Sequence, residues 1–266
     1  MKKEWRITVW GVRGSAPRPS PDCMEHGGNT ACISLDHGDH TVILDAGTGL
    51  APLGQVLSAR GGPKRLDILL SHLHIDHVLG LYTFSPFFDP DAEIHLYGGA
   101  GLERYLETLI GPPFWPLGMR DFPSKVGYHE IRPGDSFALD GLTVSTMAGD
   151  HPGGSILYRL DGDGKRLTYA LDCEAAGPVL PALTEFARGS GLLIWDASFA
   201  PSDLRPGWGH STWEQGLELG RAAQAAQVLM THYGWDCSDG ALRRQALLAG
   251  QDGSCRFAKE GMAISL

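Results

Sequence analysis

Three histidines and an aspartate fall within six consecutive residues of this chain. His72, His74, Asp76 and His77 follow the apolar run Leu66–Ser71, which predicts a β-strand. Imidazole nitrogens and carboxylate oxygens are common ligands of zinc, manganese and iron. In an extended or turning backbone, His72 and His74 project to one side and can reach one ion. Asp76 and His77 then point towards a second ion, so the spacing predicts a metal site.

Further ligands of the same kinds follow later strand-like runs. His151 lies in the glycine-rich turn 148–155, where small residues let an imidazole approach an ion closely. Asp172 follows the apolar run Leu167–Leu171, and its two carboxylate oxygens can bridge two cations. His232 follows another short apolar run. Because α/β folds usually place chemistry at strand ends, we expect two divalent ions here, with zinc favoured and manganese or iron also suited.

This order of ligands resembles the metallo-β-lactamase fold superfamily of hydrolases, over essentially the whole chain. The resemblance rests on H-x-H-x-D-H followed by His, Asp and His. It implies one ion on His72, His74 and His151, a second ion on Asp76, His77 and His232, and Asp172 between them. It also implies an α/β (α+β) fold, namely a four-layer αβ/βα sandwich with the metals at the edge between the sheets. We expect residues 1–266 to form a single hydrolase domain.

A further histidine points to one branch of this superfamily. His210 is not needed as a ligand, and it precedes a predicted helix for which Thr212 is a suitable N-cap. The His-Ser-Thr element, followed later by Thr-His-Tyr, resembles the phosphodiesterase branch that includes ribonuclease Z and the cyclic phosphodiesterases of phosphonate metabolism. The glycine-rich segments 10–19 and 27–32 resemble the opening of that branch as well.

The same resemblance suggests residues that support the metal ligands or the phosphate. Asp45, in Leu-Asp-Ala-Gly-Thr-Gly, matches a position that hydrogen-bonds the ligating histidines. Arg13, in the glycine-rich opening, is a candidate phosphate contact, and Ser211, beside His210, is a candidate either for a phosphate contact or for support of the ligands.

The implied mechanism is hydrolysis by metal-activated hydroxide. Two ions would lower the pKa of a bridging water and clamp the phosphate oxygens. Asp76 would orient the hydroxide, and protonated His210 would stabilise charge on the phosphate or protonate the leaving alkoxide. We therefore expect a binuclear metal-dependent phosphodiesterase whose catalytic residues are Asp76 and His210.

The spacing of the later ligands bears on the substrate. Only 20 residues separate His151 from Asp172, whereas ribonuclease Z usually carries a long tRNA-grasping arm between these ligands. The formal net charge of −9 also disfavours an extended nucleic-acid surface. Both observations favour a small phosphodiester, such as a cyclic nucleotide, a cyclic phosphate or a short oligonucleotide.

Three alternatives share the fold that this resemblance implies. A carbonyl-centred hydrolase, such as a lactonase or thioesterase, is disfavoured by His210 and by the Gly-Val-Arg-Gly-Ser opening. A ribonuclease Z-like RNA endonuclease is disfavoured by the short interval described above. A non-hydrolytic binder resembling cofactor-biosynthesis proteins ranks last, because such proteins often have altered ligands and every ligand position here is filled.

The elements that must position these residues follow from hydrophobic patterning. Strands are predicted at Arg6–Trp10, Ile33–Asp36, Thr41–Asp45, Leu66–Ser71, Glu93–Leu96, Leu142–Met147, Ser155–Leu160, Leu167–Leu171 and Leu192–Asp196. Helices are predicted at Leu53–Ala59, Leu102–Ile110, Val179–Ala187 and Trp213–Ala226. Asp140–Gly141 and Asp163–Gly164 predict hairpin turns. The segment Gly111–Pro123, which contains four prolines, predicts a loop that either covers a pocket or packs its aromatic residues on the body.

The composition is that of a soluble globular protein. Of 266 residues, 42% are hydrophobic and 20% are charged. The first ten residues lack the apolar core of a signal peptide, and no run approaches membrane-spanning length. The five cysteines include no C-x-x-C pair, so we expect reduced thiols, a cytoplasmic location and no membrane partner. Homodimers are common in the resembling branch, which makes a homodimer a candidate assembly.

Overall fold

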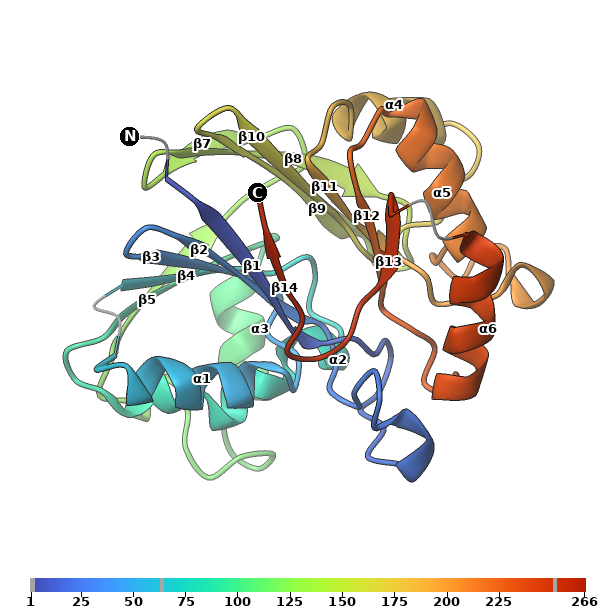
Figure 1. Ribbon diagram of the computed structural model, residues 1–266. Coiled ribbons are helices and arrows are strands. Elements are labelled where there is room, and N and C mark those ends of the chain that lie inside the picture. Colours follow the sequence, from blue (N-terminus) through green and yellow to red (C-terminus); the bar gives the residue numbers. More distant parts are fainter. Residues whose placement is uncertain (1–2, 63–64, 251–252) are drawn as a thin grey trace.

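A computed structural model describes residues 3–62, 65–250 and 253–266. Within these ranges, two seven-stranded mixed sheets face each other, and helices cover their outer faces (Figure 1). Helices α1 and α3 lie against the first sheet, whereas α4, α5 and α6 lie against the second. This layering confirms the predicted αβ/βα sandwich.

The strand bounds are as follows. The first sheet has the order β14-β1-β2-β3-β4-β5-β6, with β1 (Trp5–Gly11), β2 (Cys32–His37), β3 (His40–Leu44), β4 (Arg65–Leu69), β5 (Glu93–Gly98), β6 (Lys125–Glu130) and β14 (Ala263–Ser265). The second has the order β13-β12-β11-β10-β9-β8-β7, with β7 (Ser136–Leu139), β8 (Leu142–Gly149), β9 (Ser155–Gly162), β10 (Lys165–Ala170), β11 (Leu192–Asp196), β12 (Val228–Thr231) and β13 (Cys255–Phe257).

The α-helices are α1 (Leu50–Ala59), α2 (Ile75–Val78), α3 (Leu102–Leu109), α4 (Val179–Phe186), α5 (Trp213–Ala222) and α6 (Asp239–Ala249). Short 3-10 turns lie at Pro21–Cys23, Leu79–Thr83, Ser85–Phe88, Met119–Asp121 and Pro201–Asp203. None of the helices in the described part of the chain has both the length and the apolar character that crossing a membrane requires.

The central strands β3 and β4 of the first sheet are buried on both faces because each face is covered. In β4, Ile68 packs towards the outer helices, while its neighbour Leu69 packs between the two sheets. Successive side chains of a strand point to opposite faces, so a strand buried on both sides is a continuous apolar run. This explains why the run before the histidine cluster was recognisable as a strand.

Both predicted hairpin turns are present. Asp140 and Gly141 join β7 to β8, while Asp163 and Gly164 join β9 to β10. All four residues have positive φ, between 45° and 81°, as a two-residue type I′ turn requires. The β9–β10 hairpin fills the interval between His151 and Asp172, and this interval therefore carries no long arm.

The proline-rich segment Gly111–Pro123 lies over the first sheet's helix layer. Its Trp115 ring contacts the Tyr82 ring in a tilted arrangement with centroids 4.6 Å apart, and Trp115 packs against the core between that sheet and its helices. Phe114 is 69% exposed. Phe122, near the end of the segment, is buried and stacks on Phe87, so two of the three aromatic side chains pack on the body and Phe114 is in solvent.

Candidate metal centre

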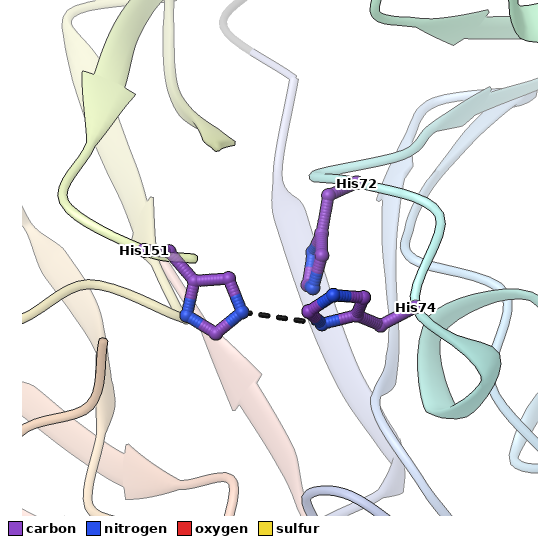
Figure 2. Close-up of side chains that lie close together, drawn as sticks. All are labelled: His72, His74 and His151. Atoms are coloured by element: carbon purple, nitrogen blue, oxygen red, sulfur yellow. Dashed lines mark hydrogen bonds between the residues drawn. The ribbon is translucent and has the colours of Figure 1, made fainter. Parts of the chain in front are cut away.

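The histidines at the ends of β4 and β8 form one compact group. One ring nitrogen from each of His72, His74 and His151 lies within 4.8 Å of the other two. Nε2 of His151 is 3.2 Å from Nδ1 of His74, and Figure 2 shows the three rings turned towards a common point. A single cation could be shared by all three nitrogens.

A second group contains Asp76, His77 and His232. The Nε2 atoms of His77 and His232 are 3.2 Å apart. Oδ2 of Asp76 lies 3.3 Å from Nε2 of His77 and 3.4 Å from Nε2 of His232. Asp76 and His77 lie in α2, which follows β4 of the first sheet, and His232 directly follows β12 of the second, so the group forms where the ends of the two sheets meet.

Asp172 lies between the two groups and turns one oxygen towards each. Its Oδ1 is 3.8 Å from Nε2 of His151 and 4.0 Å from Nε2 of His72. Its Oδ2 is 3.1 Å from Nε2 of both His77 and His232. A carboxylate placed in this way can bridge two cations.

The donor atoms fit divalent metal ions. Nε2 of His72 and Oδ2 of Asp172 are buried and have no hydrogen-bond partner. A buried polar atom without a partner costs about 1–3 kcal/mol, which an ion in contact with these atoms would offset. The ligand set contains nitrogen and oxygen but no sulfur, a combination that suits zinc, manganese or iron.

The charges and burial at the site favour the ligand forms of Asp76, Asp172, His72 and His151, whereas the neighbouring carboxylates raise the pKa values of His77 and His232 despite their burial. Burial alone would raise the pKa values of Asp76 and Asp172, but His77 and His232 hold both well below their usual range. Burial also lowers the pKa values of His72 and His151. Ionised carboxylates and neutral imidazoles are the forms that bind a cation.

Asp45 orients the His77 ring through the nitrogen that faces away from the ligand group. Its Oδ2 lies 2.7 Å from Nδ1 of His77 and accepts a 2.7 Å hydrogen bond from the hydroxyl of Tyr169. Both oxygens also accept hydrogen bonds from Ser71, one from its amide and one from its hydroxyl. Because Asp45 holds Nδ1 of His77, the Nε2 atom of the ring is directed at the site, as is usual for metal-binding histidines.

Two other histidines of the cluster, His151 and His232, are fixed by a backbone carbonyl and a hydroxyl group. Nδ1 of His151 donates to the carbonyl of Gly209 at 2.9 Å, and Nδ1 of His232 lies 3.0 Å from the hydroxyl of Ser198. Gly14 packs directly against the His232 ring, since a Cβ atom there would lie 2.5 Å from Cε1. Glycine is therefore required at this point of the N-terminal loop.

His210 lies beside the ligand cluster and is held by Asp196. Its Nδ1 is 2.8 Å from Oδ2 of Asp196 and 3.7 Å from Oδ1 of Asp172. Burial would lower the pKa of His210, but the charge and hydrogen bond of Asp196 raise it above its usual value. The following Thr212 caps α5 in a capping box with Gln215, as the sequence predicted for this N-cap.

Asp196 is a site residue that the sequence did not predict. It is the last residue of β11 and pairs in parallel register with Thr231, immediately before His232. The rule that strand ends carry chemistry was the one signal that could have identified it.

Two expected phosphate contacts need correction. The side chain of Arg13 is fully buried, and its guanidinium donates to the carbonyls of Gly27 and Cys237. Ser211 is also fully buried, and its hydroxyl donates to the carbonyl of Cys173. Because both side chains are buried, neither contacts a bound phosphate in this arrangement. Each holds together the loops around the site, which for Ser211 agrees with the other role expected of it.

A cavity of about 270 Å³ opens beside the ligands. It is lined by Ser15, His74, Ile75, Asp76, Asp172 and His210. No residue of the segment Gly111–Pro123 lines it, so that segment does not cover the site in this conformation.

The fold and the ligand geometry agree with a comparison against protein families. A model described as a beta-lactamase superfamily domain matches residues 9–233. The chain belongs to this superfamily. Membership of this superfamily confirms the expectation of a metal-dependent hydrolase. It does not give the number of bound ions or the bond that is cut.

Several relatives align over most of the chain. Ribonuclease Z of Exiguobacterium sp. is 24% identical, and the alignment covers 77% of this chain and 82% of that protein. An uncharacterised protein of Mycobacterium tuberculosis is 29% identical, covering 85% of this chain and 80% of its own length.

Solved structures share the fold. The metallo-beta-lactamase fold protein YhfI from Bacillus subtilis aligns with a TM-score of 0.76 and 18% identity, with 100% of both chains covered. A diphosphatase from the PhnP family aligns with a TM-score of 0.74 and 20% identity, with 98% of each chain covered.

Proposed function

We propose that this protein is a binuclear metal-dependent phosphodiesterase that hydrolyses small phosphodiesters. The observation that carries the proposal is His210, a histidine outside the ligand cluster that lines the cavity and is fixed by Asp196. Cleavage of a phosphodiester develops charge on the phosphate oxygens and releases an alkoxide, and a protonated histidine at this position can stabilise the first or protonate the second.

Two divalent cations, with zinc favoured, would occupy the two ligand groups. His72, His74 and His151 would hold one, Asp76, His77 and His232 the other, and Asp172 would contact both. When bound, the ions supply positive charge that neutralises phosphate oxygens and lowers the pKa of the attacking water.

Asp76 is suited to orient that water. Its Oδ2 faces His77 and His232 and accepts a 2.7 Å hydrogen bond from the amide of Ser15. Ser15 has a positive φ of 63°, a conformation that is uncommon outside glycine and recurs at functional sites. With Oδ2 engaged, Oδ1 of Asp76 remains to accept a hydrogen bond from the attacking water.

His210 is suited to act on the leaving group or the phosphate. Asp196 takes the proton on Nδ1, so only Nε2 remains available to a substrate. A protonated Nε2 can donate to a phosphate oxygen while charge develops there, or transfer its proton to the departing alkoxide.

Small substrates fit the site better than a folded RNA. The β9–β10 hairpin replaces an arm between His151 and Asp172, the cavity is about 270 Å³, and the net charge is −9. Cyclic nucleotides, cyclic phosphates and short oligonucleotides are the substrates we propose. The relatives named ribonuclease Z favour an RNA endonuclease as the second candidate.

We also propose that residues 1–266 act as one hydrolase domain. Support comes from the ligands themselves, which span His72 to His232 and are contributed by both sheets. A cytoplasmic location and a homodimer remain predictions from the sequence.

A substrate panel on metal-reconstituted protein tests the proposal. It should contain bis(p-nitrophenyl) phosphate, cyclic nucleotides, 2′,3′-cyclic phosphates, a precursor tRNA, lactones and thioesters. We expect turnover of the small phosphodiesters. Turnover of an ester with no phosphodiesterase activity would overturn the proposal, and preferential cleavage of the precursor tRNA would favour the second candidate.

A further inference from the structure

A carboxylate close to Asp172 completes a set of contacts around His151. Oε2 of Glu174 accepts a hydrogen bond from the amide of Gly207 at 2.6 Å and a longer one from the amide of Gly209 at 3.4 Å. The amide of Glu174 in turn donates to the carbonyl of Asp150 at 2.8 Å, next to His151 in the chain.

The loop that Glu174 holds is the one that contacts His151. The carbonyl of Gly209 accepts the 2.9 Å hydrogen bond from Nδ1 of His151. Gly209 has a φ of 75°, and a Cβ atom there would lie 2.4 Å from Nδ1 of His151. The loop backbone thus lies directly against the ring, and a small shift of the loop would turn the ring.

We propose that Glu174 is a positioning residue that fixes the orientation of His151 through the backbone of Gly207 and Gly209. One carboxylate oxygen receives two loop amides, which aligns the Gly209 carbonyl with Nδ1 of His151. A carbonyl accepts a hydrogen bond only from a protonated nitrogen, so this alignment keeps the proton on Nδ1 and leaves the Nε2 lone pair facing His72 and His74.

Glu174 therefore acts on one ion site more than on the other. His151 belongs to the group with His72 and His74, whereas the group of Asp76, His77 and His232 makes no contact with Glu174 among the interactions of the described residues. The inference rests on the proposed function only in taking these histidines as metal ligands. It does not depend on which bond is cut.

Binding of zinc or cobalt, measured by competition with a chromophoric chelator, tests the proposal without any substrate. We expect Glu174→Ala to weaken one of two binding events by about 10–100-fold, the usual effect of removing a group that orients a ligand, and to leave the other within twofold. The cobalt absorption spectrum of the weakened site should change. Glu174→Gln keeps one acceptor oxygen and should recover part of the affinity.

The matched control is Glu218→Ala, which removes the same charge from an exposed position on α5. It should bind both ions as the original protein does. The proposal is overturned if Glu174→Ala binds both ions with the affinity of the original protein. It is also overturned if the variant binds both ions equally more weakly while its thermal unfolding is unchanged.

A double variant tests the route through the loop. Gly209→Ala should also weaken the same ion, because its methyl group displaces the His151 ring. If both residues act through one contact, adding Glu174→Ala to the Gly209→Ala variant should lower the affinity for that ion by much less than a further tenfold. Fully additive losses would overturn the proposed route. Expected metal binding without phosphodiesterase turnover would instead refute the proposed function and leave this inference standing.

Discussion

Nδ1 of His210 lies 2.8 Å from Oδ2 of Asp196, and the two residues belong to different segments of the second half of the chain. This contact fixes the imidazole at the cavity that the metal ligands share. It also raises the pKa of His210, so that the ring keeps its second proton further into the neutral range. The contact thus provides a positioned proton donor that is not itself part of either ligand group.

Removing that donor should separate metal binding from turnover. We expect His210→Ala to bind both ions and to lose about 10²–10⁴-fold in kcat on a phosphodiester, the usual effect of losing a general acid. The measurement is kcat together with metal content by elemental analysis. His95→Ala, on β5, is the matched control and should retain full turnover. Undiminished turnover in His210→Ala would refute the assigned role.

Asp45 should control the affinity of one ion. It bonds Nδ1 of His77, a member of the group with Asp76 and His232. We expect Asp45→Asn to weaken that ion by about 10–100-fold, because the amide no longer holds the ring as a carboxylate does. Tyr169→Phe, which removes one hydrogen bond to Asp45, should have a smaller effect. Calorimetric titration with zinc measures both, and equal losses at the two sites would contradict the assignment.

A buried carboxylate in β4 should make stability depend on pH. Asp67 is fully buried; burial favours its neutral form, but hydrogen bonds from His40 and Arg65 outweigh this and lower its pKa from 3.8 to about 2. Because the folded-state pKa lies below the unfolded value, the stabilisation is complete above the unfolded pKa and is lost as pH falls through the folded one. It amounts to on the order of 2 kcal/mol at neutral pH.

Urea unfolding of metal-free protein tests this dependence. Asp67→Asn should be less stable than the original protein by on the order of 2 kcal/mol at neutral pH, and the difference should shrink as the pH falls from about 4 to about 2. A difference that is the same at both ends of this range would mean that packing, and not the charge of Asp67, accounts for the loss.

The central elements and the ligand cluster were predictable because local signals were strong. The strand at β4 is an apolar run ending in closely spaced histidines, and the turn at Asp163 carries its own type I′ signature. Every predicted strand and helix has a counterpart, with ends shifted by a few residues. The longest shift is in α5, which ends at Ala222 because Gln224 adopts a left-handed φ of 54°.

The remaining elements depend on partners distant in sequence. Strands β13 and β14 are three residues long, and they are defined by pairing with β12 and β1. Strand β6 lies at a sheet edge and is largely polar, so it lacks an apolar run. Helix α6 leaves Leu247 and Leu248 exposed, which weakens its amphipathic pattern.

Dependence on residues distant in sequence also explains the errors in the predicted site. A lone aspartate such as Asp196 has no nearby histidine in the sequence, since His210 and His232 reach it only in the folded chain. Arg13 suggested a phosphate contact because arginine commonly binds anions, but here its guanidinium is buried and donates from Nε and Nη1 to two backbone carbonyls. Burial of a charged side chain against backbone is set by tertiary packing.

Zinc titration of metal-free protein, with turnover of bis(p-nitrophenyl) phosphate measured at each addition, tests the central claim most directly. The account predicts no turnover without metal, an increase up to two bound equivalents, and a plateau beyond them. A protein that binds two equivalents and does not hydrolyse the phosphodiester, or that reaches full turnover with a single bound ion, would contradict the proposal of a binuclear phosphodiesterase.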